Sequence, residues 1–445
     1  FFFSLSRSMN IRVVSFVLLF IGLALCDYDP PRQIHLALTG NPTEMVFQWM
    51  TSLPTEESIV VVSHSNHSFS GTQKTYLPSA GYIHTVKVTG LTPSAKYEYY
   101  LGSSSSGWSS TFKFSTAPPQ GDRLTRNYIL YGDMGIFQYS YYTVEHVTAM
   151  VNSDPIEFIY QHGDYGYGND RDAMFYELSW DLFFDQMTLA MTQVPYMAAP
   201  GNHEENCGSS ICDVYANNFT VYNNRFRMPY EESGATSNMW FSFNYANVHF
   251  VSISTETDFP NCPYPDDTFG DQITWLKNDL QQANANEDVD WIIVTGHQPI
   301  YCSVSSKSTV FGVPKGDTRN VQQAFEEIFH DYKVDLYIDG HVHGYERTYP
   351  TYRSRVVGNY SQDEYVNPEA TVYIVNGSAG NIEGFYDDWH DIIPSWSAKR
   401  YWPNPEHGFG VLSVSGSSFL EWTWYRNGIT ENSTDPQVFD TFSIS

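Results

Sequence analysis

Five short glycine-containing segments carry residue types that bind metal ions, and each segment follows an apolar run. They are GDMG (132–135), GDYGY (163–167), GNHE (201–204), VTGH (294–297) and GHVH (340–343). In GHVH two histidines are two residues apart, so an extended backbone directs both imidazoles to the same side. Imidazole is the commonest nitrogen ligand of iron and zinc. One such pair carries little information, but together with four further segments it predicts a metal site.

The side chains best suited as ligands are two carboxylates, a phenol, an amide and three imidazoles. They are Asp133, Asp164, Tyr167, Asn202, His297, His341 and His343. Seven ligands exceed the four of one tetrahedral zinc ion, but they suit two ions that share a carboxylate. Two ions about 3.5–4 Å apart can clamp the attacking and leaving oxygens in a displacement at phosphorus. Each residue alone could be a turn former, a cap or a buried polar group, and the combination favours a two-metal hydrolase.

The elements that must position these residues alternate between strands and helices. We predict strands at 127–133, 156–164, 195–203, 291–297 and 334–341, and helices at Tyr142–Val151, Ala173–Met187, Gly270–Ala285 and Asn320–Tyr332. This alternation predicts an α/β sheet with helices on its faces, and ligands bind such sheets at the carboxyl ends of the strands. Further β-like runs at 371–377, 410–416 and 419–426 predict a second sheet packed on the first.

The N-terminal part contains only β-like runs. Short β-branched or aromatic segments at 33–38, 44–50, 58–63, 82–88 and 96–102 are separated by Gly, Pro, Asn and Ser, which predicts an antiparallel sandwich. Leu91-Thr92-Pro93 followed by Tyr97 resembles the tyrosine turn of fibronectin type III domains, in which the hydroxyl bonds back to the backbone. We find no catalytic residue set here. Residues 117–121 are a linker, so we expect domains at 27–119 and 123–445.

Residues 1–26 are expected to be absent from the mature protein. Arg12 precedes an apolar run from Val13 to Leu25, and Ala24 and Cys26 are small residues at signal-peptidase positions. Residues 1–8 precede Met9 and are interpreted as pre-initiator sequence. We therefore expect a soluble mature chain from about Asp27 with no membrane span, secreted or held in a lysosomal or vacuolar lumen.

The formal net charge of -27 argues against nucleic acid as a partner, because phosphate backbones require a basic protein face. The charge suits a protein that works in acid, where many carboxylates are protonated. Solubility alone is the alternative explanation.

The cysteines and sequons also fit an exported chain. Beyond the signal, the four cysteines Cys207, Cys212, Cys262 and Cys302 allow three disulfide connectivities. We favour Cys207–Cys212, which closes a short loop, together with Cys262–Cys302. Glycans are predicted at Asn66, Asn218, Asn359 and Asn432, and not at Asn376, which ends a predicted core strand.

The five segments together resemble the five-block signature of metallophosphoesterases, and the tyrosine three residues after the second aspartate resembles the purple acid phosphatases. The resemblance extends over nearly all of the mature chain and includes Tyr345-Glu346-Arg347 and Gly380-Asn381-Ile382-Glu383-Gly384. It implies a two-sheet α/β metallophosphoesterase sandwich flanked by helices and preceded by an all-β fibronectin III-like sandwich, as in the larger plant-type members.

The resemblance also implies how the ligands are shared. Asp133, Tyr167 and His343 would bind Fe(III), Asn202, His297 and His341 would bind a divalent zinc, manganese or iron ion, and Asp164 would bridge the two. Phenolate and carboxylate are hard anionic donors that suit a trivalent ion. A manganese or zinc pair is the alternative metal content.

The implied reaction is hydrolysis of small phosphomonoesters by a metal-activated hydroxide. His203 would orient the phosphate and protonate the leaving group, and a structural bond to Glu204 is its alternative role. Phosphodiesterase or nucleotide pyrophosphatase activity at the same site is an alternative, as is a non-catalytic binding glycoprotein. Larger members of this family are often dimers, so a homodimer is a further expectation.

The chain departs from the resemblance at one place. Many family members carry a second histidine shortly after the one at His297, whereas this chain reads QPIYCSVSSKS there. His330 falls on a predicted helix and is not expected to be equivalent. Lys307 could supply the positive charge, Tyr301 could supply a hydroxyl, or the function is absent. Arg347 is predicted to be a structural ion-pair partner and not a phosphate ligand.

Overall fold

A computed structural model describes the chain over residues 29–63, 67–153, 155–264, 268–428 and 435–445. The predicted signal segment and two of the predicted glycosylation sites, Asn66 and Asn432, lie outside these ranges. Within them, no helix combines the length and the apolar character that a membrane span needs.

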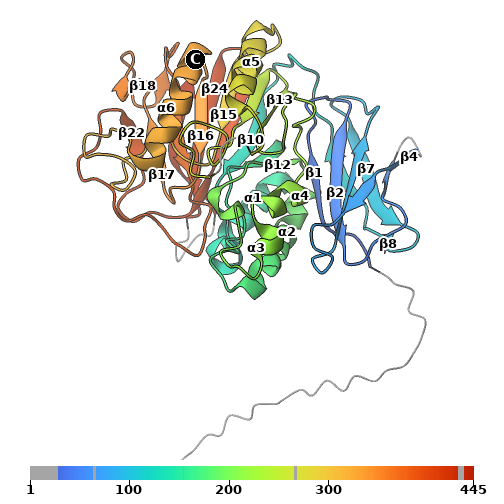
Figure 1. Cartoon of the computed structure of the whole chain (residues 1–445). Coiled ribbons are helices and arrows are strands. Elements are labelled where there is room, and N and C mark those ends of the chain that lie inside the picture. Colours follow the sequence, from blue (N-terminus) through green and yellow to red (C-terminus); the bar gives the residue numbers. More distant parts are fainter. Residues whose placement is uncertain (1–28, 64–66, 154, 265–267, 429–434) are drawn as a thin grey trace, which may run out of the picture.

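The N-terminal part is a sandwich of two antiparallel sheets, drawn in blue in Figure 1. One sheet has the order β1-β2-β6-β5; the other has the order β4-β3-β7-β8, with β9 paired to β7. Phe47, Val86 and Leu101 are fully buried in its core. The strands are β1 (Arg32–Ala37), β2 (Met45–Thr51), β3 (Ile59–Val62), β4 (His67–Ser70), β5 (Thr72–Lys74), β6 (Tyr82–Val88), β7 (Lys96–Ser103), β8 (Gly107–Trp108) and β9 (Phe112–Ser115).

All five strands predicted for this sandwich are present. The additional strands β4, β5, β8 and β9 have two to four residues each, too few to show an alternating pattern. The tyrosine turn is also confirmed, because the hydroxyl of Tyr97 accepts the backbone N–H of Thr92 at 2.9 Å.

The strands in the rest of the described chain form two seven-stranded mixed sheets and one small two-stranded sheet of β18 (Thr351–Tyr352) and β19 (Arg355–Val356). The first has the order β12-β11-β10-β23-β24-β25-β20 and the second β13-β14-β15-β16-β21-β17-β22. The first contains β10 (Arg126–Tyr131), β11 (Ile156–Gln161), β12 (Tyr196–Ala198), β20 (Glu364–Tyr365), β23 (Gly408–Ser415), β24 (Phe419–Arg426) and β25 (Gln437–Ile444). The second contains β13 (Phe241–Tyr245), β14 (Val248–Ser252), β15 (Trp291–Thr295), β16 (Leu336–Asp339), β17 (Tyr345–Thr348), β21 (Val372–Asn376) and β22 (Ser397–Arg400).

The two sheets share an aromatic core. Phe250 of the second sheet packs on Tyr128 and Phe158 of the first, with ring centroids 5.1 and 5.0 Å apart. The strands β10, β11 and β12 are mutually parallel, as are β14, β15, β16 and β21. The strand ends that carry the five segments are therefore divided between two sheets, three in the first and two in the second.

The C-terminal β-like runs correct one prediction. They do not form a sheet of their own: β21 joins β16 in the second sheet, whereas β23 pairs with β10 and extends the first. A period of two residues identifies a strand but not its partner, so the assignment of these runs to a separate second sheet is wrong.

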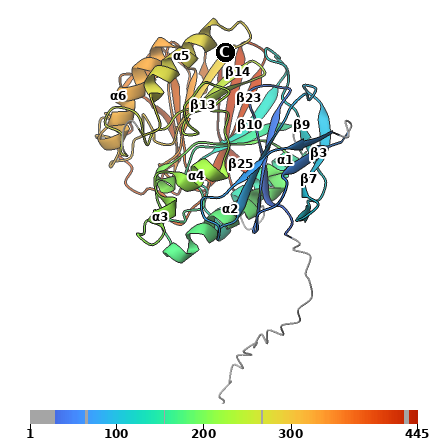
Figure 2. The same cartoon turned by 45° about the vertical axis from the view of Figure 1, so that its right-hand side comes forward.

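Helices cover the outside of this two-sheet core. Leu276 of α5 and Phe325 of α6 are buried in one cluster with Val294 and Tyr337 of the second sheet. On the other side, α1 and α2 pack on each other, and α2 also packs on β1, so both views place it beside the blue strands (Figures 1 and 2). The helices are α1 (Tyr141–Ser153), α2 (Tyr176–Met191), α3 (Asp213–Ala216), α4 (Thr220–Arg225), α5 (Gln272–Ala285) and α6 (Gly316–Asp331), with short 3-10 turns η1 (Phe137–Tyr139), η2 (Ala173–Phe175) and η3 (Asn202–Glu204).

A buried arginine fastens the sandwich to the rest of the molecule. Arg225, at the end of α4, donates to Glu177 at 2.8 Å, to Asp181 at 3.0 Å and to Gln33 of β1 at 3.0 Å. The hydroxyl of Tyr76 donates to the same Glu177 at 2.6 Å. These contacts satisfy a fully buried guanidinium, so α2, α4 and the sandwich depend on one another.

Of the two predicted disulfides, one is confirmed and one is wrong. Cys207 and Cys212 are bonded. Cys302 is instead buried beside Val342 and Val375, while the thiol of Cys262 donates to the carbonyl of Tyr264 at 3.0 Å in a different part of the core. Four cysteines in a sequence do not by themselves specify which of them are close in space.

Candidate metal centre

The turns that follow the strands hold several predicted ligands in an unusual backbone conformation. Asp133, Asp164, Tyr167 and His341 all have a left-handed backbone, with φ of 64°, 56°, 53° and 63°. This conformation costs free energy for residues other than glycine, and such residues concentrate at functional sites. Each turn thereby reverses the chain at the strand end and directs a polar side chain toward the same space.

Two glycines allow these turns to approach one another. A side-chain carbon on Gly163 would lie 2.7 Å from the backbone of Gly201 and from Nδ1 of His297. One on Gly340 would lie 2.4 Å from Oδ2 of Asp133. Any other residue at either position would push the loops apart.

The first group of ligands surrounds the hydroxyl of Tyr167. This oxygen lies 3.2 Å from Oδ1 of Asp133, 3.0 Å from Nε2 of His343 and 3.5 Å from Oδ2 of Asp164. Nε2 of His343 is also 3.3 Å from Oδ1 of Asp133. These four predicted ligands therefore converge on one point from β10, β11 and the turn after β16.

The second group surrounds the amide oxygen of Asn202. Nδ1 of His341 lies 2.8 Å from this oxygen, and Nε2 of His297 lies 3.0 Å from it. Nε2 of His297 is also 3.1 Å from Oδ2 of Asp164. Asp164 thus belongs to both groups. Each group contains three side chains that could hold a metal ion: Asp133, Asp164 and His343 in the first group, and Asp164, His297 and His341 in the second.

Backbone carbonyls orient two of the imidazoles. Nδ1 of His297 is 2.7 Å from the carbonyl oxygen of His162, and Nδ1 of His343 is 2.8 Å from that of Gly384. A carbonyl only accepts hydrogen bonds, so Nδ1 carries the proton in both rings and Nε2 presents a lone pair to the ligand groups.

Further buried groups that the ligand prediction did not include hold the centre in place. Glu204 accepts the backbone N–H groups of Asp164, Tyr165 and Gly201 at 2.8, 2.9 and 2.8 Å. Asn381 donates to the hydroxyl of Tyr167 at 3.0 Å. Glu204 belongs to the GNHE segment and Asn381 to the Gly380–Gly384 segment. A single sequence contains no pattern that identifies a residue whose role is to support a ligand.

His203 faces the first group from its outer side. Its ring lies 4.3 Å from that of Tyr167, and its Nε2 is 3.8 Å from both Oδ2 of Asp164 and Glu383. Its Nδ1 is 2.7 Å from Oδ1 of Asn169. The alternative bond from His203 to Glu204 is not formed, because Glu204 binds the backbone instead.

The structure separates the candidates for the missing second histidine. Tyr301 is fully buried, and its hydroxyl donates to Glu326 on the side of α6. His330 stacks on Tyr352, with ring centroids 3.9 Å apart. Lys307 alone of these three approaches the ligands, since its Nζ is 2.7 Å from Nε2 of His341.

The prediction for Arg347 is confirmed. Its fully buried guanidinium donates to both carboxylate oxygens of Asp440 at 2.7 and 2.9 Å and to the carbonyl of Gln362 at 2.9 Å. It therefore links β17 to β25 and is structural.

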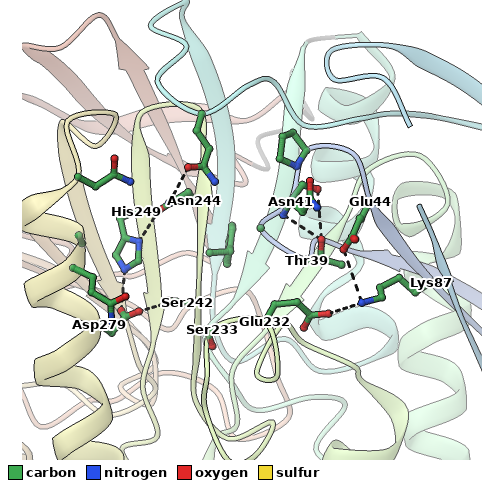
Figure 3. Close-up of a pocket in the computed structure, with 17 residues that line it drawn as sticks. Thr39, Asn41, Glu44, Lys87, Glu232, Ser233, Ser242, Asn244, His249 and Asp279 are labelled. Atoms are coloured by element: carbon green, nitrogen blue, oxygen red, sulfur yellow. Dashed lines mark hydrogen bonds and ion pairs between the residues drawn. The ribbon is translucent and has the colours of Figure 1, made fainter. Parts of the chain in front are cut away.

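A separate cleft of about 610 Å³ lies where the sandwich meets the second sheet (Figure 3). There Asp279 accepts the hydroxyl of Ser242 at 2.6 Å and lies 2.9 Å from Nε2 of His249, whose Nδ1 is 2.7 Å from Asn244. Because the aspartate lies between serine and histidine, this order does not activate a serine nucleophile. The contacts connect β13, β14 and α5, so we assign them a structural role.

Three family models match consecutive parts of the chain. They are the purple acid phosphatase N-terminal domain at residues 31–116, the calcineurin-like phosphoesterase at 127–345 and the iron/zinc purple acid phosphatase-like protein C at 370–441. Acid phosphatase type 7 of Danio rerio is 32% identical over 411 residues, which cover 88% of this chain and 86% of the relative. The chain belongs to the purple acid phosphatase family.

Other similarities agree with this membership. Probable purple acid phosphatase 20 of Arabidopsis thaliana is 32% identical over 410 residues, covering 90% of this chain and 85% of the relative. The solved structure of a purple acid phosphatase from yellow lupin (Lupinus luteus) seeds superimposes with a TM-score of 0.77 at 23% identity, covering 94% of this chain and 74% of that one. The two-sheet fold with a β-rich N-terminal domain is therefore that of the family.

Membership in the purple acid phosphatase family implies a binuclear metal centre, and the ligand groups fit one. Burial and the nearby carboxylates of Asp133 and Asp164 raise the pKa of Tyr167 well above its ordinary value. Burial alone would lower the pKa of His297, but the carboxylate of Asp164 raises it well above its ordinary value. The carboxylates of Asp133 and Asp164 contribute to both shifts, and buried carboxylates placed this close together favour a cation beside them.

Proposed function

We propose that this protein is a secreted acid phosphatase that hydrolyses phosphomonoesters at a binuclear centre of Fe(III) and a divalent zinc, manganese or iron ion. The observation that carries the proposal is the convergence of seven metal-type side chains in two groups that share Asp164. A non-catalytic glycoprotein would have no chemical reason to retain all seven. Relatives over most of the chain are named acid phosphatases, which supports the same reaction.

The two groups differ in charge, and this difference supports the assignment of the ions. Asp133 and a deprotonated Tyr167 would bring two negative charges to the first ion, with His343 as the third ligand. Asn202, His297 and His341 are neutral ligands for the second, and Asp164 is the bridge. Hard anionic donors favour the trivalent ion, so Fe(III) belongs with Tyr167.

The chain's own residues would position the ester and supply a proton. Metal ions held in this centre supply Lewis acidity and lower the pKa of water, which provides a nucleophile in acid. His203, 8% exposed at the edge of the first group, lies where it can donate to a phosphoryl oxygen or to the leaving group. Asn169, at 2.7 Å, holds its ring in that orientation.

The substrate class is tested with two chromogenic esters. We expect kcat/KM for p-nitrophenyl phosphate to exceed that for bis-p-nitrophenyl phosphate, because a dianionic monoester gains more from two cations than a monoanionic diester does. Asp164→Asn should abolish both activities, whereas Asp279→Asn, in the separate cleft, should retain the preference. Equal or greater diesterase activity in the wild-type protein would contradict the proposal and favour a phosphodiesterase or pyrophosphatase.

Export and glycosylation belong to the same proposal. The Cys207–Cys212 disulfide is typical of oxidising compartments, and Asn218 and Asn359 are exposed whereas Asn376 is fully buried. In secreting cells, Asn218→Gln and Asn359→Gln should each remove one glycosidase-sensitive mass step. The homodimer stays a prediction, which light scattering on the secreted protein would measure.

A further inference from the structure

Lys307 lies on a loop that is fixed on both sides of it. The N–H and hydroxyl of Ser303 both donate to the buried carboxylate of Glu346, at 2.6 and 2.7 Å. The hydroxyl of Ser305 donates to Asp388 at 2.7 Å. Beyond Lys307, the carbonyl of Ser308 accepts a ring N–H of His390 at 3.0 Å. The backbone position of Lys307 is thereby set, and its side chain is the part that can reorient.

The ammonium group of Lys307 faces the second ligand group. Its Nζ lies 2.7 Å from Nε2 of His341, whose other ring nitrogen faces the amide oxygen of Asn202. In the described part of the chain Lys307 makes no salt bridge with a carboxylate. The half-buried ammonium group of Lys307 thus has a ring nitrogen of His341 as its neighbour, and not a carboxylate.

That contact is incompatible with His341 as a metal ligand through Nδ1. When Nδ1 gives its lone pair to a metal ion, Nε2 carries the ring proton and becomes a donor. An ammonium group has three donors and no acceptor. Two donors then face each other, so the long lysine side chain must turn to an acceptor nearby.

We propose that Lys307 binds the phosphoryl group of the substrate and takes the place of the second histidine that many family members have. His203 lies beside Tyr167 of the first ligand group and Lys307 beside His341 of the second, so each ligand group has one of these two side chains next to it. Lys307 contacts non-bridging phosphoryl oxygens and thereby selects dianionic phosphomonoesters over monoanionic diesters. This inference rests on the phosphatase activity proposed above.

The test compares inorganic phosphate binding by metal-loaded variants in calorimetry, with metal content measured on the same samples. Lys307→Met keeps most of the length of the side chain and removes the charge, and it should weaken phosphate binding about 10- to 100-fold, as expected for loss of a charge-assisted hydrogen bond. Lys307→Arg should restore most of the affinity. Lys315→Met is the matched control. Lys315 is an exposed lysine on the same loop, and its backbone N–H donates to the backbone carbonyl of Lys307 at 2.9 Å, a contact that the substitution leaves in place.

Activity provides a second readout. Lys307→Met should lower kcat/KM for p-nitrophenyl phosphate more than for the bis ester, and Lys307→Gln should repeat this result if the methionine variant folds poorly. Unchanged phosphate affinity in Lys307→Met, an equal loss in Lys315→Met, or loss of metal ions from Lys307→Met would each overturn the assignment. If the wild-type protein itself bound no phosphate and hydrolysed neither ester, the proposed function would fail as well.

Discussion

Tyr167 differs from the other six predicted ligands because its side chain is neutral in its ordinary state and would have to lose a proton to bind a metal ion as an anion. Its hydroxyl is buried and lies 3.2 Å from Asp133 and 3.5 Å from Asp164, so ionising it would add a third negative charge to a small volume. Only a cation of high charge would make that favourable. Tyr167 is therefore the predicted ligand whose chemistry depends most on the metal ion.

His341 is a predicted ligand of the proposed divalent ion. We predict that His341→Ala will lose the divalent ion and lower kcat by more than about 100-fold, the upper end of the cost of losing a group that merely orients a ligand. His330→Ala is the control, because His330 lies on α6 and stacks on Tyr352. Metal analysis and turnover measure the outcome, and a variant that keeps both would place the divalent ion elsewhere.

At the scale of elements, the strand ends were predictable and their division between sheets was not. Gly-Asp and Gly-His after apolar runs identified the turns that carry Asp133, Asp164 and His341. The pairing of β23 with β10 could not be predicted, because alternation along a strand says nothing about which edge it joins. The four-residue helix α3 and the strands β4, β5, β8 and β9 were missed because they are too short to show a pattern, and the longer strands β13, β14 and β25 were also not predicted.

A half-buried acid, Asp335, directly before β16 should make stability depend on pH. Burial raises the pKa of Asp335 from 3.8 to about 7, and its carboxylate accepts the N–H of Ile292 at 2.8 Å. Between these values the folded chain binds more protons than the unfolded chain, so this contribution to stability is complete below pH 3.8 and is lost as pH rises through about 7.

The Asp335→Asn variant has no carboxyl at this position, so it should not lose this stability as pH rises. We expect its free energy of unfolding, relative to wild type, to be greater at pH 8 than at pH 5, by less than about 1.4 kcal/mol per pH unit crossed because the carboxyl is partly accessible to solvent. Denaturant titrations at both pH values measure this, with Asp331→Asn as the exposed control. A difference that does not change with pH would refute the assignment.

At the scale of the whole molecule, the N-terminal sandwich is part of the structural support of the catalytic part. One continuous apolar cluster includes Phe47 and Leu101 of the sandwich together with Phe184 of α2 and Phe250 of the second sheet. The sequence predicted the sandwich from its strand spacing, but not this packing. The wrong Cys262–Cys302 pairing has the same cause, since distances between remote segments depend on the assembled core.

Arg225 tests this dependence. Arg225→Met would leave the carboxylates of Glu177 and Asp181 without their buried partner, so we predict a loss of about 3–5 kcal/mol in the free energy of unfolding. Arg227→Met, which breaks more accessible pairs with Glu231 and Glu232, should cost about 1 kcal/mol or less. Equal effects of the two variants in denaturant titrations would show that the buried network does not hold the sandwich in place.

The most direct test of the central claim is the metal content and visible spectrum of the purified protein beside its Tyr167→Phe variant. The account predicts two metal ions per chain, at least one of them iron, and a visible charge-transfer band that Tyr167→Phe abolishes while the protein stays folded. A single ion per chain, or a band that persists unchanged in Tyr167→Phe, would contradict the assignment of Fe(III) to Asp133, Tyr167 and His343.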